Sequence, residues 1–238
     1  MRLPPSPYDF DAGWSDDGLE LTITDVRLGA RADGYHPVVL RTSRGEVQLR
    51  HYPVQGATVG VVFAGGTGGG WDTPGCGRLF PDLCEALQAD GITALRVRYR
   101  YPSNLEESTL DVLAGVYFLD GIGVGRLALV GHSFGGAVVI QAAANVESVA
   151  ALVALSTQSH GVEPLRDLPM GCSSLFLHGE ADEVLPPACS RFAYRLAPEP
   201  KRLSLYPNVR HGLDEAAPEI RAEVREWVLQ HTTNGSRR

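Results

Sequence analysis

Short apolar runs recur along the chain from residue 60 onward, and glycine-rich polar stretches separate them. Short apolar runs of about four to eight residues are typical of parallel strands that are buried on both faces. The runs that predict such strands are Gly60–Ala64, Ile92–Val97, Leu127–Val130, Val149–Leu155, Ser174–Leu177 and Leu203–Tyr206. The pattern therefore predicts the strands of a parallel sheet.

The region before residue 60 has a different pattern. Leu21–Val26, Val38–Arg41 and Val47–His51 alternate partially between apolar and polar residues, and glycine or aspartate turn signals separate them. Partial alternation with short turns is typical of an antiparallel meander. We expect three antiparallel strands at the N-terminal side of the sheet.

Helical periodicity fills gaps between the apolar runs. Leu79–Ala89 and Ser108–Leu119 each carry one apolar stripe, and a small apolar segment follows residue 136. Near the end, apolar residues recur at helical spacing: Ile220, Val224, Trp227 and Val228. Strands that alternate with helices predict an α/β fold, with a mostly parallel sheet, helices on both faces and right-handed crossovers.

The composition fits one folded unit. The chain has 238 residues, 44% of them apolar, and no linker or repeat divides it, so we expect a single domain over residues 1–238. Residues 1–20 are rich in proline, aspartate and glycine and predict an N-terminal extension, and residues 232–238 predict a flexible tail. The formal charge of −7 gives no basic surface for nucleic acid or an anionic membrane, so neither is expected as a partner.

Cysteine usage and the N-terminal sequence bear on location. The four cysteines include no C-x-x-C pair and no cluster with histidine, which indicates reduced thiols and no metal site. The first residues lack the apolar run of a signal peptide, and no stretch approaches the roughly 20 apolar residues that span a bilayer. These features favour the cytoplasm.

The segment Gly131-His132-Ser133-Phe134-Gly135 carries the strongest chemical signal. It is a G-x-S-x-G motif between an apolar strand and a helix of small residues, which is the context that lifts a serine hydroxyl above a sheet. Glycines flank the serine because side chains there would collide with the neighbouring strand and helix. The alternative is a structural Gly-Ser turn, which the strand–turn–helix context disfavours.

With this motif in place, the chain from Gly60 to Gln230 resembles the α/β-hydrolase superfamily. It is most similar to the small, capless, dienelactone-hydrolase-like esterases. Those relatives often carry cysteine at the elbow, whereas Ser133 here favours ordinary ester chemistry. The resemblance implies an α/β-hydrolase fold and a nucleophile, acid and base in the chain order Ser, Asp, His.

The resemblance also indicates the acid and the base. His178-Gly179-Glu180-Ala181-Asp182 resembles the H-G-x-x-D loop that supplies the acid, which implies Asp182. His211 follows the last predicted strand, where the family's base lies. Such a base activates the serine, and the acid orients the base. We interpret His178 as a residue that packs beside this loop. The alternative for His211 is an ordinary surface loop histidine.

Two backbone N–H groups are needed to stabilise an oxyanion. One is expected from Phe134, which follows the nucleophile, and the other from the glycine-rich loop after Ala64. Alignment on the strand favours Thr67, with Gly66 as the second candidate. Gly65 stands where relatives have histidine. A phosphate-binding loop is the alternative, but the G-K-[ST] ending of a P-loop is missing.

The substrate pocket is expected to include Gly65, Trp71, Tyr99 and His132. Residues 156–172 are too few to form a cap domain, so we expect an open site bounded by this segment, the glycine loop and the 99–105 stretch.

The expected function is hydrolysis of a small-molecule carboxylic ester through an acyl-enzyme, with no cofactor and no metal. An amidase, peptidase or acyltransferase would use the same residues, and a non-catalytic binding protein of this fold is the other alternative. The natural substrate and the oligomeric state are left open by the sequence.

Overall fold

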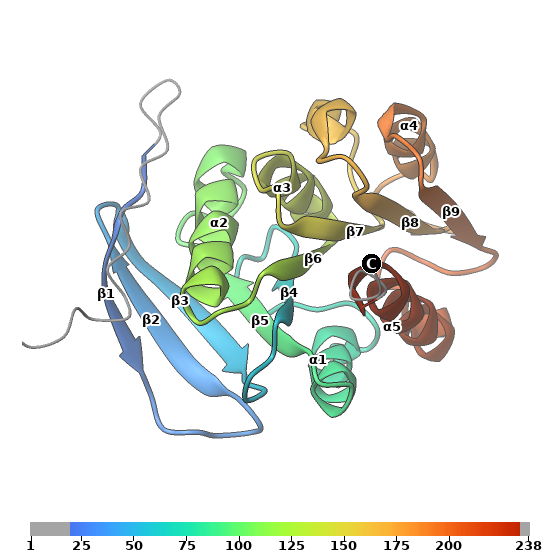
Figure 1. The fold of residues 1–238 in the computed structure, drawn as a ribbon. Coiled ribbons are helices and arrows are strands. Elements are labelled where there is room, and N and C mark those ends of the chain that lie inside the picture. The colour runs from blue at the N-terminus through green and yellow to red at the C-terminus, as the bar shows by residue number, and fades with distance from the viewer. Residues whose placement is uncertain (1–19, 234–238) are drawn as a thin grey trace, which may run out of the picture.

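The computed structural model describes residues 20–233, which form one sheet of nine strands with helices on both faces (Figure 1). The predicted N-terminal extension, apart from Glu20, and residues 234–238 of the predicted tail lie outside the described residues. The strand order is β1-β2-β3-β5-β4-β6-β7-β8-β9. The α/β fold class predicted from the sequence is confirmed.

The strands reproduce the two patterns of the sequence. β1–β3 form the antiparallel meander, β3 pairs antiparallel with β5, and β4 to β9 run parallel to one another. β7 has the predicted bounds, and the other predicted strands are found with ends shifted by at most two residues, as expected for boundaries. The strands are β1 (Ile23–Leu28), β2 (His36–Thr42), β3 (Gly45–Tyr52), β4 (Val59–Ala64), β5 (Thr93–Arg98), β6 (Arg126–His132), β7 (Val149–Leu155), β8 (Ser173–Gly179) and β9 (Lys201–Tyr206).

Two apolar cores lie on opposite faces of the sheet. Helices α2 (Leu105–Gly121), α3 (Phe134–Ala143) and α4 (Ala188–Leu196) cover one face, and α1 (Leu79–Ala89) and α5 (Ala217–Thr233) cover the other (Figure 1). The central strands β4, β6 and β7 contribute residues to both cores, which is why apolar residues predominate along them.

Local side-chain contacts help to define the start of α2 and the end of α5. The Asn104 side chain caps α2 by accepting a hydrogen bond from the N–H of Glu107 at 3.0 Å. The sequence predicts a flexible tail that begins at Thr232, but in the structure Thr232 and Thr233 belong to α5. The Thr232 hydroxyl donates to the Val228 carbonyl at 2.7 Å, which satisfies a polar group inside the helix.

Only a short 3-10 helix, Glu163–Asp167, interrupts the loop between β7 and β8. Val162 and Leu165 of this segment are fully buried in the core beside α3. The segment therefore packs as part of the domain wall and does not form a cap. Across residues 20–233, no helix combines the length and apolarity needed to cross a membrane.

Candidate active site

The carboxyl ends of parallel strands meet at one edge of the sheet, and three polar side chains follow three of these ends. Ser133 follows β6, Asp182 lies in the loop after β8, and His211 lies in the loop after β9. These are the three residues that the sequence and the family resemblance indicated as nucleophile, acid and base. The structure brings their side chains into one continuous contact.

Ser133 lies on a sharp turn between β6 and α3. Its backbone φ is 56° and ψ is −121°, a strained conformation for a residue with a side chain. Gly135 is needed here because a Cβ atom at that position would lie 2.3 Å from the Gly65 carbonyl oxygen. Because α3 approaches the loop after β4 so closely, glycine is required at position 135. The turn presents the Ser133 hydroxyl at the N-terminus of α3.

The imidazole of His211 lies between Ser133 and Asp182. Its Nε2 atom is 3.1 Å from Ser133 Oγ, and its Nδ1 atom is 2.7 Å from Asp182 Oδ2. Because a carboxylate only accepts hydrogen bonds, Nδ1 carries the proton and the lone pair of Nε2 faces the serine. This tautomer is the one that can take a proton from a hydroxyl.

Asp182 is a buried carboxylate with several donors. Its side chain is 0% exposed, and Oδ1 accepts hydrogen bonds at 2.8 Å from the N–H groups of both Val184 and Leu185. Burial alone would raise the pKa of Asp182, but the hydrogen bonds from Leu185, His211 and Val184 outweigh it and lower the pKa below its ordinary value. The carboxylate is therefore kept ionised beside the imidazole.

Sequence reasoning missed the contribution of His178. This fully buried residue was interpreted as packing beside the loop, but its Nε2 atom lies 3.1 Å from Asp182 Oδ2 and 3.0 Å from the Leu185 carbonyl oxygen. Its Nδ1 atom lies 2.7 Å from the Ser190 hydroxyl. Burial lowers the pKa of His178, so the neutral ring donates from Nε2 and accepts from Ser190.

Backbone contacts hold the acid and base loops together. The N–H of Ala181 donates to the Val209 carbonyl oxygen at 3.0 Å, and the N–H of Glu180 donates to the Tyr206 carbonyl oxygen at 2.8 Å. A Cβ atom at Gly179 would lie 2.1 Å from the Val209 carbonyl oxygen, so the two loops approach as closely as backbones can. These contacts fix the distance between Asp182 and His211.

His132 contacts both the backbone and the ring of His211. Its Nε2 atom donates to the backbone carbonyl oxygen of His211 at 3.0 Å, and the two rings lie 5.0 Å apart. Burial lowers the pKa of His132 to about 4, so this ring stays neutral at physiological pH. It lines the cavity beside Ser133.

The expected oxyanion donors lie around the serine. Phe134 is the first residue of α3, where an N–H has no acceptor within the helix. Gly66 lies so close that a Cβ atom there would be 3.7 Å from the Ser133 Cβ atom. Thr67 follows it along the edge of the same cavity. Phe134 and Gly66 therefore lie next to Ser133, and Thr67 lines the same cavity as the serine.

A cavity of about 510 Å³ opens above Ser133. It is lined by Gly66–Gly68, Asp72–Pro74, Cys76, Gly77, His132, Ser133, His211, Gly212 and Asp214. The walls include the side chains of Asp72, Cys76 and Asp214, which no sequence motif singled out. Neither residues 156–172 nor residues 99–105 bound this cavity, contrary to expectation.

Three of the predicted pocket residues lie outside the cavity lining. Trp71 instead packs its ring against the guanidinium of Arg50, 4.2 Å from the ring centroid. Tyr99 is 5% exposed, and its hydroxyl donates to the backbone carbonyl oxygen of Gly65. Gly65 is itself buried beneath the glycine loop. Their contacts within the protein account for their absence from the cavity wall.

Within residues 20–233, no three histidine, cysteine, aspartate or glutamate side chains are grouped closely enough to hold a metal ion. The described cysteines are all unpaired thiols in the structure.

Solved structures with a similar fold include several hydrolases. A dienelactone hydrolase from Anabaena variabilis has 19% sequence identity and a TM-score of 0.72, covering 83% of this chain and 98% of its own. XC6422 from Xanthomonas campestris, described as a serine hydrolase without a lid, has 18% identity and a TM-score of 0.65, covering 85% and 97%. Est1E from Butyrivibrio proteoclasticus has 16% identity and a TM-score of 0.66, covering 87% and 99%.

At these identities the similarities establish the fold alone. No protein of curated function matches the sequence. The sequence model of the alpha/beta hydrolase fold matches residues 71–205, which is more than half of the chain and includes Ser133 and Asp182. The chain therefore belongs to the α/β-hydrolase fold family.

Proposed function

We propose that this protein is a serine hydrolase that cleaves a carboxylic ester of a small molecule through Ser133, His211 and Asp182. The observation that carries the proposal is the continuous contact from the Ser133 hydroxyl through the His211 imidazole to the buried Asp182 carboxylate. A serine hydroxyl is a weak nucleophile by itself, and this arrangement supplies the base and the group that orients the base.

In the first step, Ser133 Oγ attacks the ester carbonyl carbon while His211 Nε2 takes the hydroxyl proton. The carbonyl oxygen becomes an oxyanion, which the N–H of Phe134 and an N–H from Gly66 or Thr67 stabilise. Asp182 stabilises the imidazolium through its contact with Nδ1 and does not itself take the proton. His211 then protonates the departing alcohol, which leaves an acyl group on Ser133.

In the second step, water takes the place of the alcohol. His211 removes a proton from the water as it attacks the acyl carbonyl, and the same oxyanion donors stabilise the second tetrahedral intermediate. Collapse returns the proton to Ser133 and releases the carboxylic acid. The residues already named complete both steps, and no cofactor is required.

The cavity supports a small substrate. Its volume of about 510 Å³ lies within the range of roughly 300–1,000 Å³ that is typical of small-molecule sites. The segment between β7 and β8 adds no cap over it. An amide would use the same machinery, and the substrate panel below distinguishes esters from amides.

Labelling with a fluorophosphonate probe tests the proposal. We expect the wild-type protein to be labelled, and Ser133→Ala to lose labelling while keeping its unfolding midpoint. The same pair is then assayed on p-nitrophenyl esters of increasing acyl length and on aminoacyl anilides. Ester turnover that Ser133→Ala abolishes supports an esterase, and anilide turnover alone would assign an amidase. A folded wild-type protein that is neither labelled nor active contradicts the proposal and favours a binding protein.

A further inference from the structure

Tyr99, which follows β5, makes two hydrogen bonds to the glycine-rich loop beside Ser133. Its buried hydroxyl donates to the Gly65 carbonyl oxygen at 2.9 Å, and its backbone N–H donates to the Gly69 carbonyl oxygen at 3.2 Å. One residue therefore holds both ends of the loop that carries Gly66 and Thr67. Glycines have no side chains with which to fix their own conformation, so the loop depends on such outside contacts.

The ring of Tyr99 also contacts the other side of the expected oxyanion site. It packs edge-to-face against Phe134, with ring centroids 5.9 Å apart and planes at 89°. Phe134 supplies one expected N–H donor, and the glycine loop supplies the other. Tyr99 therefore contacts both of the segments that are expected to supply the oxyanion donors.

The hydroxyl of Tyr99 can act only as a donor to this carbonyl. Burial, and to a lesser extent the nearby Asp111 carboxylate, raises the pKa of Tyr99 well above its ordinary value, so the phenol stays protonated. The Gly65 carbonyl oxygen is buried, and loss of the phenol would leave it without this partner. An unpaired buried acceptor is costly enough to shift the loop.

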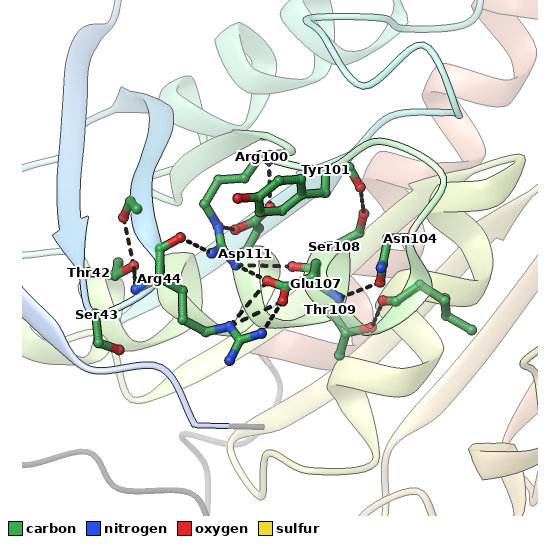
Figure 2. Close-up of polar contacts among 12 residues, drawn as sticks. Thr42, Ser43, Arg44, Arg100, Tyr101, Asn104, Glu107, Ser108, Thr109 and Asp111 are labelled. Carbon is green, nitrogen blue, oxygen red and sulfur yellow. Dashed lines mark hydrogen bonds and ion pairs between the residues drawn. The ribbon is translucent and has the colours of Figure 1, made fainter. Parts of the chain in front are cut away.

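A buried charge network fixes the chain immediately after Tyr99. The backbone N–H of Arg100 donates to Asp111 Oδ2 at 2.7 Å, and its guanidinium donates to the Arg44 carbonyl oxygen at 2.7 Å and to Glu107 Oε2 at 2.9 Å. Figure 2 shows Arg100 between Arg44 and the α2 residues Glu107 and Asp111. The side chains of Arg100 and Asp111 are 5% and 0% exposed.

This network makes the end of β5 a rigid support. Ion pairs whose side chains are almost fully buried resist rearrangement, because breaking one leaves an uncompensated charge in the protein interior. Pro102, three residues beyond Tyr99, reinforces the support from the same segment: a Cβ atom at Gly69 would lie 2.1 Å from its Cγ atom. The glycine loop is therefore packed against a fixed wall and hydrogen-bonded to it by Tyr99.

We propose that Tyr99 is a positioning residue that holds the oxyanion loop in its active conformation by donating its phenolic hydrogen bond to Gly65. This inference depends on the function proposed above, because a positioned oxyanion loop matters only to an enzyme that forms an oxyanion. Tyr99 acts through the loop backbone and does not touch the substrate.

The variant Tyr99→Phe removes only the hydroxyl and keeps the ring against Phe134. Removal of an oxyanion donor lowers kcat by about 100-fold to 1,000-fold, and misplacement of one should cost a smaller part of this, about 10-fold to 100-fold. KM should change less than about twofold, because the lost interaction serves the transition state. Affinity for a trifluoromethyl ketone, which forms an oxyanion on Ser133, should fall in parallel with kcat.

Amide hydrogen exchange reports the loop without using activity. In Tyr99→Phe, the amides of residues 65–70 should exchange faster than in the wild type, while those of β7 do not change. Tyr52→Phe is the matched control, since Tyr52 is equally buried and its hydroxyl contacts Arg96 on the neighbouring strand. This control should keep the wild-type kcat and the wild-type exchange in residues 65–70.

The outcomes separate the two proposals. If the wild type is active and Tyr99→Phe keeps its kcat, its ketone affinity and its loop exchange, the positioning role is wrong and the hydrolase proposal stands. A rise in KM with unchanged kcat would also overturn it. If the wild type is inactive, the hydrolase proposal fails and Tyr99 loses its proposed role in positioning oxyanion donors, whatever the loop exchange shows.

Discussion

His178 Nε2 lies 3.1 Å from Asp182 Oδ2, and both side chains are fully buried. The same carboxylate oxygen accepts the hydrogen bond from His211 at 2.7 Å. Two histidines therefore share one oxygen of the proposed acid. The second histidine, itself held by Ser190, limits the directions in which this oxygen can point.

The variant His178→Leu should lower kcat by about tenfold, because it removes one hydrogen bond to a charged group that orients the base. His178→Gln should recover part of this loss, since its amide N–H can donate to the same oxygen. Steady-state kinetics on a p-nitrophenyl ester measures both variants. Ser190→Ala, which removes only the contact to Nδ1, should have a smaller effect.

Folding must be checked because His178 is buried. Each variant is compared with the wild type by urea unfolding at the assay pH. A folded His178→Leu protein with wild-type kcat would show that the contact to Asp182 has no influence on the reaction.

The wall segment between β7 and β8 leads to a prediction about how substrate enters. Val162 and Leu165 are fully buried beside α3, and the Gly161 carbonyl oxygen accepts a hydrogen bond from the Gln141 side chain at 2.8 Å. A segment held in this way does not open and close as a lid does. The rate of ester hydrolysis should therefore show no sudden increase when the ester concentration passes its solubility limit.

The measurement is a rate curve with tributyrin, below and above saturation. A sudden increase in rate once emulsion forms, or a lag before steady state in a rapid-mixing experiment, would contradict a permanently open site.

Much of the fold could be predicted because its signals are local. Leu79–Ala89 and Val149–Leu155 were predicted with the bounds that the structure has, since apolar spacing alone decides which face is buried. The turn at Ser133 was also predictable, because strand, glycines and helix lie within a few residues of one another. The order of the acid and base along the chain came from the family resemblance.

The supporting contacts of the site depend on distant parts of the chain. Trp71 directly follows the glycine loop in sequence, and Tyr99 begins the 99–105 stretch that was expected to bound the site, and these positions alone suggested a pocket. In the structure Tyr99 instead bonds to Gly65, and Trp71 packs against Arg50 of β3. No periodicity or motif encodes such contacts, since they arise only when the strands are assembled.

Gly135 provides a direct test of the tight turn after Ser133. A Cβ atom there would lie 2.3 Å and 2.5 Å from the carbonyl oxygens of Gly65 and Ala64, which are backbone atoms and cannot move aside cheaply. Gly135→Ala should therefore lower the free energy of unfolding by about 3 kcal/mol, although alanine is the better helix former. Urea unfolding measures this loss.

Gly125→Ala is the matched control, because a Cβ atom at this position would meet nothing within 4 Å. Its free energy of unfolding should stay within about 0.5 kcal/mol of the wild type. Equal stability of the two variants would mean that α3 does not approach β4 as closely as the structure shows.

The free energy of unfolding should fall in mild acid because of a buried histidine outside the candidate active site. His51 lies between Thr93, 2.9 Å from its Nε2 atom, and the ring of Phe118. Burial, followed by the nearby His36, lowers the pKa of His51 from 6.5 to about 4. Between these two pH values the unfolded chain binds a proton that the folded protein does not, so stability rises with pH and is lost as the pH falls from 6.5 to 4.

The full shift corresponds to about 3 kcal/mol at most for this one group. His51→Gln keeps a side-chain N–H for Thr93 but cannot be protonated, so the difference in unfolding free energy between pH 7.5 and pH 4.5 should be smaller than in the wild type. Comparing the two proteins at each pH cancels the contributions of His132 and of the carboxyl groups, which titrate in both. His160→Gln, which changes an exposed histidine, should keep the wild-type pH dependence. If His51→Gln and the wild type lose the same stability between these pH values, His51 is protonated as readily in the folded protein as in the unfolded chain.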